Sequence, residues 1–133
     1  MVAGVSEIMK VEIGKLFGRE VLNFPVDDQK KIFSFIVDVQ KNGLCNLEGR
    51  NKNSENVPTD DIEFVSKVRI AQAHKLWHYH IGIVDYDMTK PYGDRTSEYI
   101  LHYKNELVAG EIRIVDFSSH PPFRPPTAPY LED

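Results

Sequence analysis

The chain has few of the features that define several large classes of protein. Its single cysteine, Cys45, cannot form an internal disulfide, and there is no CxxC pair for a redox or metal site. The sequence also contains no glycine-rich phosphate loop and no nucleophile elbow. A lone thiol without an evident catalytic partner predicts a structural role for Cys45 and suits a reducing compartment.

Long hydrophobic runs are lacking as well. The longest apolar runs extend over only a few residues, so no membrane-spanning segment is expected. The N-terminal stretch has no continuous apolar core and contains Glu7 and Glu12, which is untypical of a signal peptide. The sequence therefore predicts a cytoplasmic protein that has no membrane partner.

An excess of positive charge is also missing. Sixteen basic residues stand against twenty acidic ones, which gives a net charge of −4. When the chain is divided after residue 61, each part has eight basic and ten acidic residues, so neither part is a basic arm. Affinity for nucleic acid comes largely from Lys and Arg on phosphates. The composition therefore argues against a broad nucleic-acid-binding surface but leaves room for a local basic patch.

What the sequence does contain is enough for one domain. Its 133 residues, 41% of them hydrophobic, predict a single domain over residues 1–133. The clearest element is a helix from Asp27 or Asp28 to about Asn42, capped by these carboxylates and ended by Gly43. One apolar stripe runs along it at helical spacing: Ile32, Phe35, Ile36 and Val39.

The other elements are shorter. A strand is expected over residues 8–13 and a turn or short helix over residues 15–22. A long polar loop over residues 46–61 follows the main helix. After the last predicted strand comes a tail, residues 121–133, with five of the eight prolines, which is expected to be extended.

Three strands are expected in the second half of the chain. They run from Lys67 or Ala73 to Val84, from Glu98 to Lys104 and from Glu111 to Phe117, and the last two form a hairpin. The fold class is therefore α+β. An N-terminal strand and one or two helices pack on an antiparallel sheet of three to four strands.

All five histidines fall in this β-rich half: His74, His78, His80, His102 and His120. In the first of its strands, Trp77, Tyr79, Ile81 and Ile83 alternate with His74, Leu76, His78 and His80. The first set is expected to pack on the main helix and the second set to face away from it. If the next strand pairs alongside, His102 and Lys104 join the histidine face, and Tyr99, Leu101 and Tyr103 turn inward.

A row of imidazoles with nearby basic side chains predicts a particular chemistry. Histidines can take up and deliver protons near neutral pH, and Arg or Lys can bind a phosphate. Together they can cleave RNA, without metal, by attack of the 2′-oxygen on the adjacent phosphate. We expect His102, Lys104 and Arg113 to contact RNA. The non-functional alternative is that these histidines are solvated polar residues on a strand.

A metal site is a second alternative. His78-Tyr79-His80 begins like the HxH metal motif of cupins. No Glu follows it at the usual place, because the next residues are Ile-Gly-Ile-Val and Asp85. A small metal-dependent β enzyme that uses His78 and His80 remains open.

The order of these parts resembles the RelE/ParE toxin superfamily, and most closely its YafO-type members. The matching segments are FIVDVQKNG (35–43), a polar loop with Gly49-Arg50, WHYHIGI (77–83), RTSEYILHYKN (95–105) and EIRIVDFSSHPPFR (111–124). The resemblance covers roughly residues 8–124.

This resemblance implies a RelE-like sheet with helices on one face. It also implies a toxin that cleaves mRNA on the ribosome, is neutralised by a cognate antitoxin and uses neither a metal nor a small-molecule cofactor. Residues carried over as catalytic are His78, His80, His120 and Arg124. A ParE-like member that inhibits a protein target such as gyrase, without catalytic histidines, is the alternative within the same superfamily.

Overall fold

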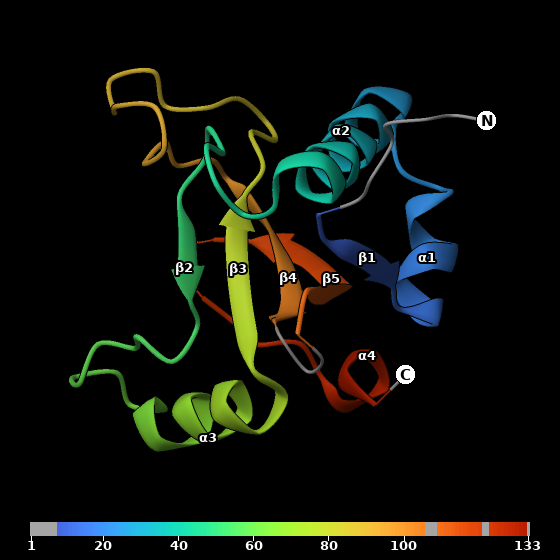
Figure 1. Cartoon of the computed structure of the whole chain (residues 1–133). Coiled ribbons are helices and arrows are strands. Elements are labelled where there is room, and N and C mark those ends of the chain that lie inside the picture. The colour runs from blue at the N-terminus through green and yellow to red at the C-terminus, as the bar shows by residue number, and fades with distance from the viewer. Residues whose placement is uncertain (1–7, 106–108, 121–122, 133) are drawn as a thin grey trace.

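The computed structural model describes residues 8–105, 109–120 and 123–132. Its centre is one five-stranded mixed sheet with the strand order β1-β5-β4-β3-β2 (Figure 1). β1 is parallel to β5, and the other neighbours are antiparallel. The strands are β1 (Lys10–Ile13), β2 (Asn51–Asn53), β3 (Leu76–His80), β4 (Tyr99–Asn105) and β5 (Glu111–Ser119).

The longest helix confirms the main helix expected from the sequence. α2 runs from Val26 to Asn42 and buries Ile32, Phe35, Ile36 and Val39, the predicted stripe. Gly43 follows with a φ of 69°, a conformation that glycine adopts without steric cost. The expected cap is wrong, because Pro25 occupies the N-cap position. Asp27 and Asp28 lie in the first turn, where their charge still suits the helix dipole.

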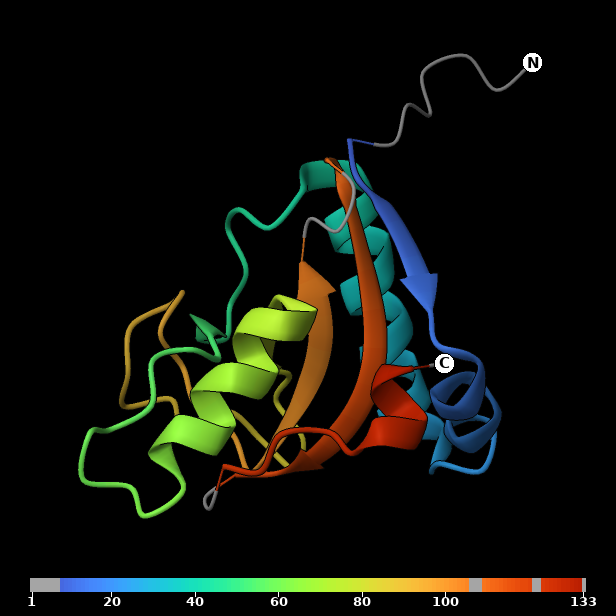
Figure 2. The ribbon, with the colours of Figure 1, turned by 90° about the horizontal axis from the view of Figure 1, so that it is seen from below.

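Two apolar layers hold the fold together. α1 (Lys15–Val21) and α2 cover one face, where Phe17 and Val39 pack with Tyr79, Leu101 and Tyr103 from the sheet. α3 (Phe64–His74) and α4 (Ala128–Leu131) pack on the other face (Figure 2). Between these two helices and the sheet, four buried residues pack together: Ala71, Leu76, Val115 and Leu131. β5 thus supplies apolar side chains to both layers, as its sequence predicts.

The sheet differs from the expected one in three ways. It has five strands, because β1 joins it parallel to β5 and β2 forms inside the predicted loop 46–61. Residues 64–74 are helical rather than the start of a strand, so His74 lies in the last turn of α3. β3 ends at His80 instead of Val84. The α+β class and the hairpin of β4 and β5 are confirmed.

The tail contains one helical turn that was not expected. In α4 a proline lies in the first turn, where its missing N–H costs no hydrogen bond. Leu131 is buried there, and its carbonyl oxygen accepts a hydrogen bond from Lys104 Nζ. Residues 121, 122 and 133 of this tail, residues 106–108 of the hairpin connection and residues 1–7 lie outside the described part. Within that part, no helix combines the length and apolar character needed to cross a membrane.

Candidate active site

β3 sorts its side chains as its alternating sequence predicts. Tyr79 points to α2, where its ring stacks on Phe35 at 4.8 Å between centroids. His78 and His80 therefore lie on the opposite face of the sheet. The register of β3 and β4 pairs His78 with His102, so the expected third histidine of this face is present.

A fourth imidazole completes what we call the histidine cluster: His78, His80, His102 and His120. His120, just after β5, lies 5.7 Å from His78 and 5.4 Å from His80 between ring centroids. His78 is 6.3 Å from His80 and 6.4 Å from His102. The structure therefore brings together three of the four predicted catalytic residues and one predicted RNA contact.

The alternative that these histidines are solvated polar residues does not hold for His78, His80 and His102. His78 and His80 are each 4% exposed and His102 is fully buried, while His120 is half-buried. The ring of Phe123 lies beside the cluster, at 4.9 Å from His78 and 5.8 Å from His102 between ring centroids. The cluster is therefore a partly enclosed site rather than a row of solvated side chains.

Hydrogen bonds fix three of the four rings. His78 Nδ1 lies 2.8 Å from Ser54 Oγ, and His102 Nε2 lies 2.7 Å from Ser118 Oγ. His80 Nδ1 lies 2.9 Å from the carbonyl oxygen of Ser97 and 3.0 Å from its amide nitrogen. When this Nδ1 donates its proton to the carbonyl, the Nε2 lone pair of His80 is available as a base.

Two ring nitrogens have no such support. His102 Nδ1 and His120 Nδ1 are buried and make no hydrogen bond to any described residue. Buried polar atoms are usually satisfied, so unpaired ones near a cleft indicate a place for a bound water or ligand. For His120 this nitrogen lies in the most accessible ring of the cluster.

Burial controls the protonation of the cluster. Desolvation lowers the pKa of His78 to about 2, that of His102 to about 3 and that of His80 to about 4. Repulsion from neighbouring imidazoles adds to this, and the hydrogen bond to Ser97 partly offsets it at His80. Desolvation also lowers the pKa of His120. The cluster is therefore neutral at pH 7 and can accept protons.

Basic side chains border a cleft of about 630 Å³ beside the cluster. Lys52 in β2 pairs directly with His78, and Arg50 precedes the same strand. Arg50 Nε binds Asp94 Oδ1 at 2.7 Å, and this partner raises the pKa of the guanidinium. The residues around the cleft are Arg50, Lys52, His78, His80, Asp85, Tyr86, Asp87, Lys90, Thr96, Ser97, Glu98 and His120.

Tyr86 closes the back of this cleft, and two glycines make room for it. Its Oη donates to the carbonyl oxygen of His80 at 2.7 Å and lies 2.9 Å from Tyr79 Oη. A Cβ on Gly49 would meet that same carbonyl at 1.9 Å, and one on Gly82 would meet the Tyr86 ring at 2.6 Å. Close packing around the backbone of His80 therefore depends on both glycines.

Three predicted site residues lie elsewhere. Arg113 Nη1 pairs with Glu12 Oε2 at 3.0 Å, at the edge of the sheet that β1 forms. Lys104 is buried against Leu131, and Arg124 is exposed. Among the described residues, none of these three borders the cleft, where Arg50 and Lys52 supply the positive charge instead.

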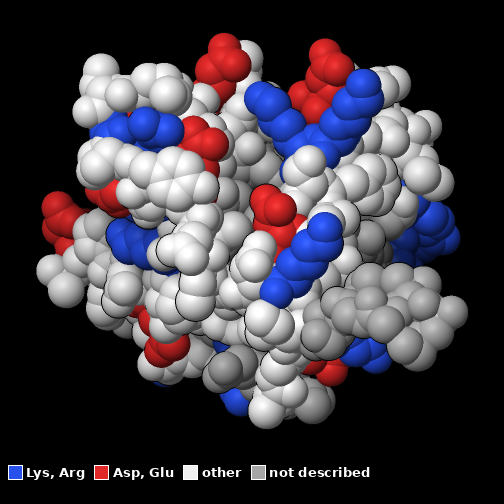
Figure 3. Space-filling model, turned by 45° about the horizontal axis from the view of Figure 1, so that its top comes forward, with Lys and Arg blue, Asp and Glu red and all other residues white. Residues whose placement is uncertain are grey.

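The face of the molecule on the α2 side, opposite the histidine cluster, has no large basic surface among its described residues. On the face shown in Figure 3, Lys and Arg side chains lie beside Asp and Glu side chains instead of gathering in one area. This distribution agrees with the net charge of −4. Any binding of nucleic acid by this chain would therefore depend on a few local contacts.

The metal alternative finds no preformed site. Among the described residues, no three His, Cys, Asp or Glu side chains are arranged to hold a metal ion. Cys45 is a free, exposed thiol.

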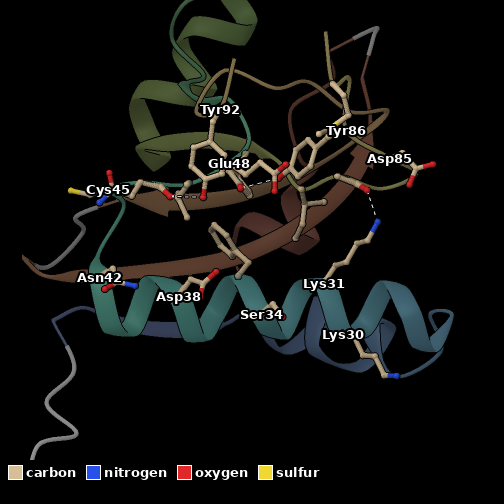
Figure 4. Close-up of a pocket in the computed structure, with 17 residues that line it drawn as sticks. Lys30, Lys31, Ser34, Asp38, Asn42, Cys45, Glu48, Asp85, Tyr86 and Tyr92 are labelled. Atoms are coloured by element: carbon tan, nitrogen blue, oxygen red, sulfur yellow. Dashed lines mark hydrogen bonds between the residues drawn. The ribbon is translucent and has the colours of Figure 1, made fainter. Parts of the chain in front are cut away.

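A larger cleft, of about 970 Å³, lies on the other side of the sheet between α2 and the loops that contain Glu48 and Tyr92 (Figure 4). Two of its charged side chains, Lys31 and Glu48, already have partners. Lys31 Nζ donates to the carbonyl oxygens of Gly82 and Val84, and Glu48 pairs with Arg95. Tyr86 is shared with the histidine side, but no histidine borders this cleft. The candidate active site is therefore the histidine cluster.

Comparisons with known proteins add no relative, since no protein-family model, curated protein or solved structure matches the chain.

Proposed function

We propose that this chain is a metal-independent endoribonuclease, a YafO-like toxin with a RelE-like fold that cleaves mRNA on the ribosome and thereby stops translation. The observation that supports this most is the convergence of His78, His80 and His120 at a cleft bordered by Arg50 and Lys52. Proton-transfer groups and phosphate-binding groups thus meet in one place.

The chemistry needs one base and one acid on either side of a phosphate. His80 Nε2 takes the proton of the ribose 2′-hydroxyl, and the 2′-oxygen forms a bond to phosphorus. The bond from phosphorus to the 5′-oxygen breaks, and His120 gives its proton to that oxygen. The products are a 2′,3′-cyclic phosphate and a 5′-hydroxyl.

The protonation states fit these roles once RNA is bound. His80 is neutral at pH 7 in the free protein because burial lowers its pKa to about 4, so it can act as the base. His120 also has a lowered pKa, but a phosphate anion beside it favours the protonated imidazole. Substrate binding therefore favours the protonated form of His120, which is the form that can act as the acid. His78 supports both rings, and Arg50 and Lys52 hold the phosphate.

The shortage of basic surface favours a substrate that another molecule delivers. Three cationic side chains border the cleft: Arg50, Lys52 and Lys90. They provide only a modest electrostatic affinity for free RNA. Docking on the ribosome would hold mRNA at the cleft. The protein would therefore act in the cytoplasm, and a cognate antitoxin would keep it inactive until needed.

The test is cleavage of mRNA in a translating cell extract, with cut sites mapped by primer extension. His80→Ala and His120→Ala should each reduce cleavage about 10²- to 10⁴-fold while the protein stays folded, because each removes one proton-transfer group. His74→Ala is the matched control, since this histidine lies on α3 outside the cluster. Cleavage should continue in chelator.

Two outcomes would refute this proposal. One is full cleavage by a folded double variant that lacks His80 and His120. The other is loss of cleavage in chelator with recovery on adding zinc or manganese, which would favour a metal enzyme. If the wild-type chain arrests growth without cutting mRNA, a ParE-like action on a protein target such as gyrase is the better explanation.

A further inference from the structure

A smaller cavity of about 300 Å³ adjoins the catalytic cleft, and the proposed reaction does not use it. Three residues border both spaces: Lys52, His78 and His120. A phosphate held beside His120 and Lys52 would therefore lie at the junction of the two cavities. We call the smaller one the Phe123 pocket, because the ring of Phe123 forms part of its wall.

The walls of the Phe123 pocket are of two kinds. Phe123, Val57 and Pro58 provide apolar surface, and Phe123 is only half-buried, so part of its ring is available for contact. Asn56 is exposed at the border and offers an amide that can both donate and accept hydrogen bonds. A flat aromatic surface beside an amide is a typical environment for a nucleobase.

The aromatic ring is held in a defined position. Its centroid lies 4.9 Å from that of His78 and 6.0 Å from that of His120. Lys67 Nζ lies 6.0 Å from the same centroid and is fixed by an ion pair with Asp61 Oδ2 at 2.7 Å. Asp61 Oδ1 in turn accepts the backbone N–H of Glu63 at the start of α3. The ring is thus supported by the sheet and by α3, which suits a stacking surface.

We propose that the Phe123 pocket binds one nucleobase next to the scissile phosphate, with Phe123 stacking on the base and Asn56 bonding to its edge. The position of the base next to a scissile phosphate rests on the proposed function. Binding of the base itself does not, and it can be measured separately. The pocket is at the small end of ligand sites, so it accommodates a single base rather than a dinucleotide. Asn56 would then determine which base is preferred.

The experiment is a binding titration of the full chain, in which binding is measured by calorimetry or NMR. The probes are AMP, GMP, CMP and UMP, with ribose 5-phosphate as the matched ligand without a base. At least one nucleotide should bind more tightly than ribose 5-phosphate. Phe123→Ala should remove this advantage, about fivefold to 150-fold, because stacking on an aromatic ring contributes that much. The affinity for ribose 5-phosphate should change less than twofold.

Further variants test whether the nucleobase advantage comes from stacking on Phe123 and from the amide of Asn56. Phe123→Trp should preserve the advantage, since it retains a stacking ring, and Asn56→Ala should change the ranking of the four nucleotides. Phe33→Ala is the control, because this phenylalanine is exposed on the outer side of α2. If Phe123→Ala fails to fold, Phe123→Leu keeps apolar volume without a stacking face and should also lose the advantage.

Two results would overturn the proposal. One is equal affinity of the wild-type chain for the nucleotides and for ribose 5-phosphate. The other is tighter nucleotide binding by Phe123→Ala, which would make the ring a cover over the histidines. A chain that shows the nucleobase advantage but cuts no RNA would retain this pocket and refute only the proposed reaction.

Discussion

Acid should destabilise this protein well above the pH at which its carboxylates are protonated. His78, His80 and His102 are buried and neutral in the folded chain, with pKa values of about 2, 4 and 3. In the unfolded chain each returns to about 6.5. Below pH 6.5 the unfolded chain therefore binds three protons that the folded chain does not bind, and stability must fall as the pH falls.

The size of this effect follows from counting protons. At pH 5, each of the three histidines lowers the free energy of unfolding by roughly 2 kcal/mol. Asp116 acts in the opposite direction, because burial raises its pKa to about 6 and the folded chain gains a proton there. Asp116 therefore raises the free energy of unfolding by roughly 1 kcal/mol at pH 5. The net loss of roughly 5 kcal/mol is comparable to the whole stability of many small domains.

The assay is urea unfolding at steps of pH from 7.5 to 5, followed by the fluorescence of the single tryptophan, Trp77. His102→Gln should reduce the net loss at pH 5 by about two fifths, from roughly 5 to roughly 3 kcal/mol, because it removes one of the three groups without removing a polar partner for Ser118. His74→Gln should change it much less, since His74 is half-exposed. A free energy of unfolding that stays constant between pH 7 and 5 would show that the histidines take up protons equally in the folded and the unfolded chain, and the reasoning would fail.

Two further predictions concern the core and the cleft. Phe35→Ala should lower the free energy of unfolding by about 3–5 kcal/mol, because Phe35 is buried and stacks on Tyr79, whereas Phe33→Ala on the exposed side of α2 should cost less than about 1 kcal/mol by the same urea assay. A similar cost for the two would mean that α2 faces the sheet differently. For a non-cleavable 2′-O-methyl RNA, the logarithm of the binding constant should fall with the logarithm of the salt concentration, with a slope no steeper than about −2. Lys52→Gln should make this slope shallower by about 0.7, whereas Lys41→Gln should leave it unchanged. A much steeper slope, or equal effects of the two lysines, would place the RNA on another surface.

The parts of this fold that the sequence predicts are those that local patterns determine. The spacing of Ile32, Phe35, Ile36 and Val39 predicts α2, and the alternation around Tyr79 predicts which face of β3 carries His78 and His80. Both patterns repeat within a few residues, so no distant contact is needed to read them.

Lys67, the earlier of the two strand starts expected from the sequence, lies inside α3, although local signals for a helix exist. The α3 residues Val65, Val68 and Ile70 are β-branched and resemble a strand. The signals that favour a helix are Asp61, whose side chain bonds the N–H of Glu63 at the helix start, and the alanines of the last turns. Burial of Ala71 against the sheet decides between the two.

The rest depends on contacts between distant segments. β2 consists of Asn-Lys-Asn, which has little strand propensity, and it forms because it pairs with β3. This pairing is what brings Arg50 and Lys52 to the histidines. The contact between Phe123 and His78 likewise joins segments that are far apart in the sequence. No local pattern reports either contact, so the placement of Arg50, Lys52 and Phe123 beside the histidines could not be predicted.

The parallel pairing of β1 with β5 has a consequence for biosynthesis. β1 is the earliest strand of the described chain, and its partner β5 is the last, so the sheet cannot close until β5 has left the ribosome. His120 and Phe123 follow β5 and emerge later still. A nascent or prematurely terminated product therefore has neither a complete sheet nor a complete histidine cluster. For a protein proposed to attack translation, this order of assembly delays the complete site until residues 111–120 have left the ribosome that makes it.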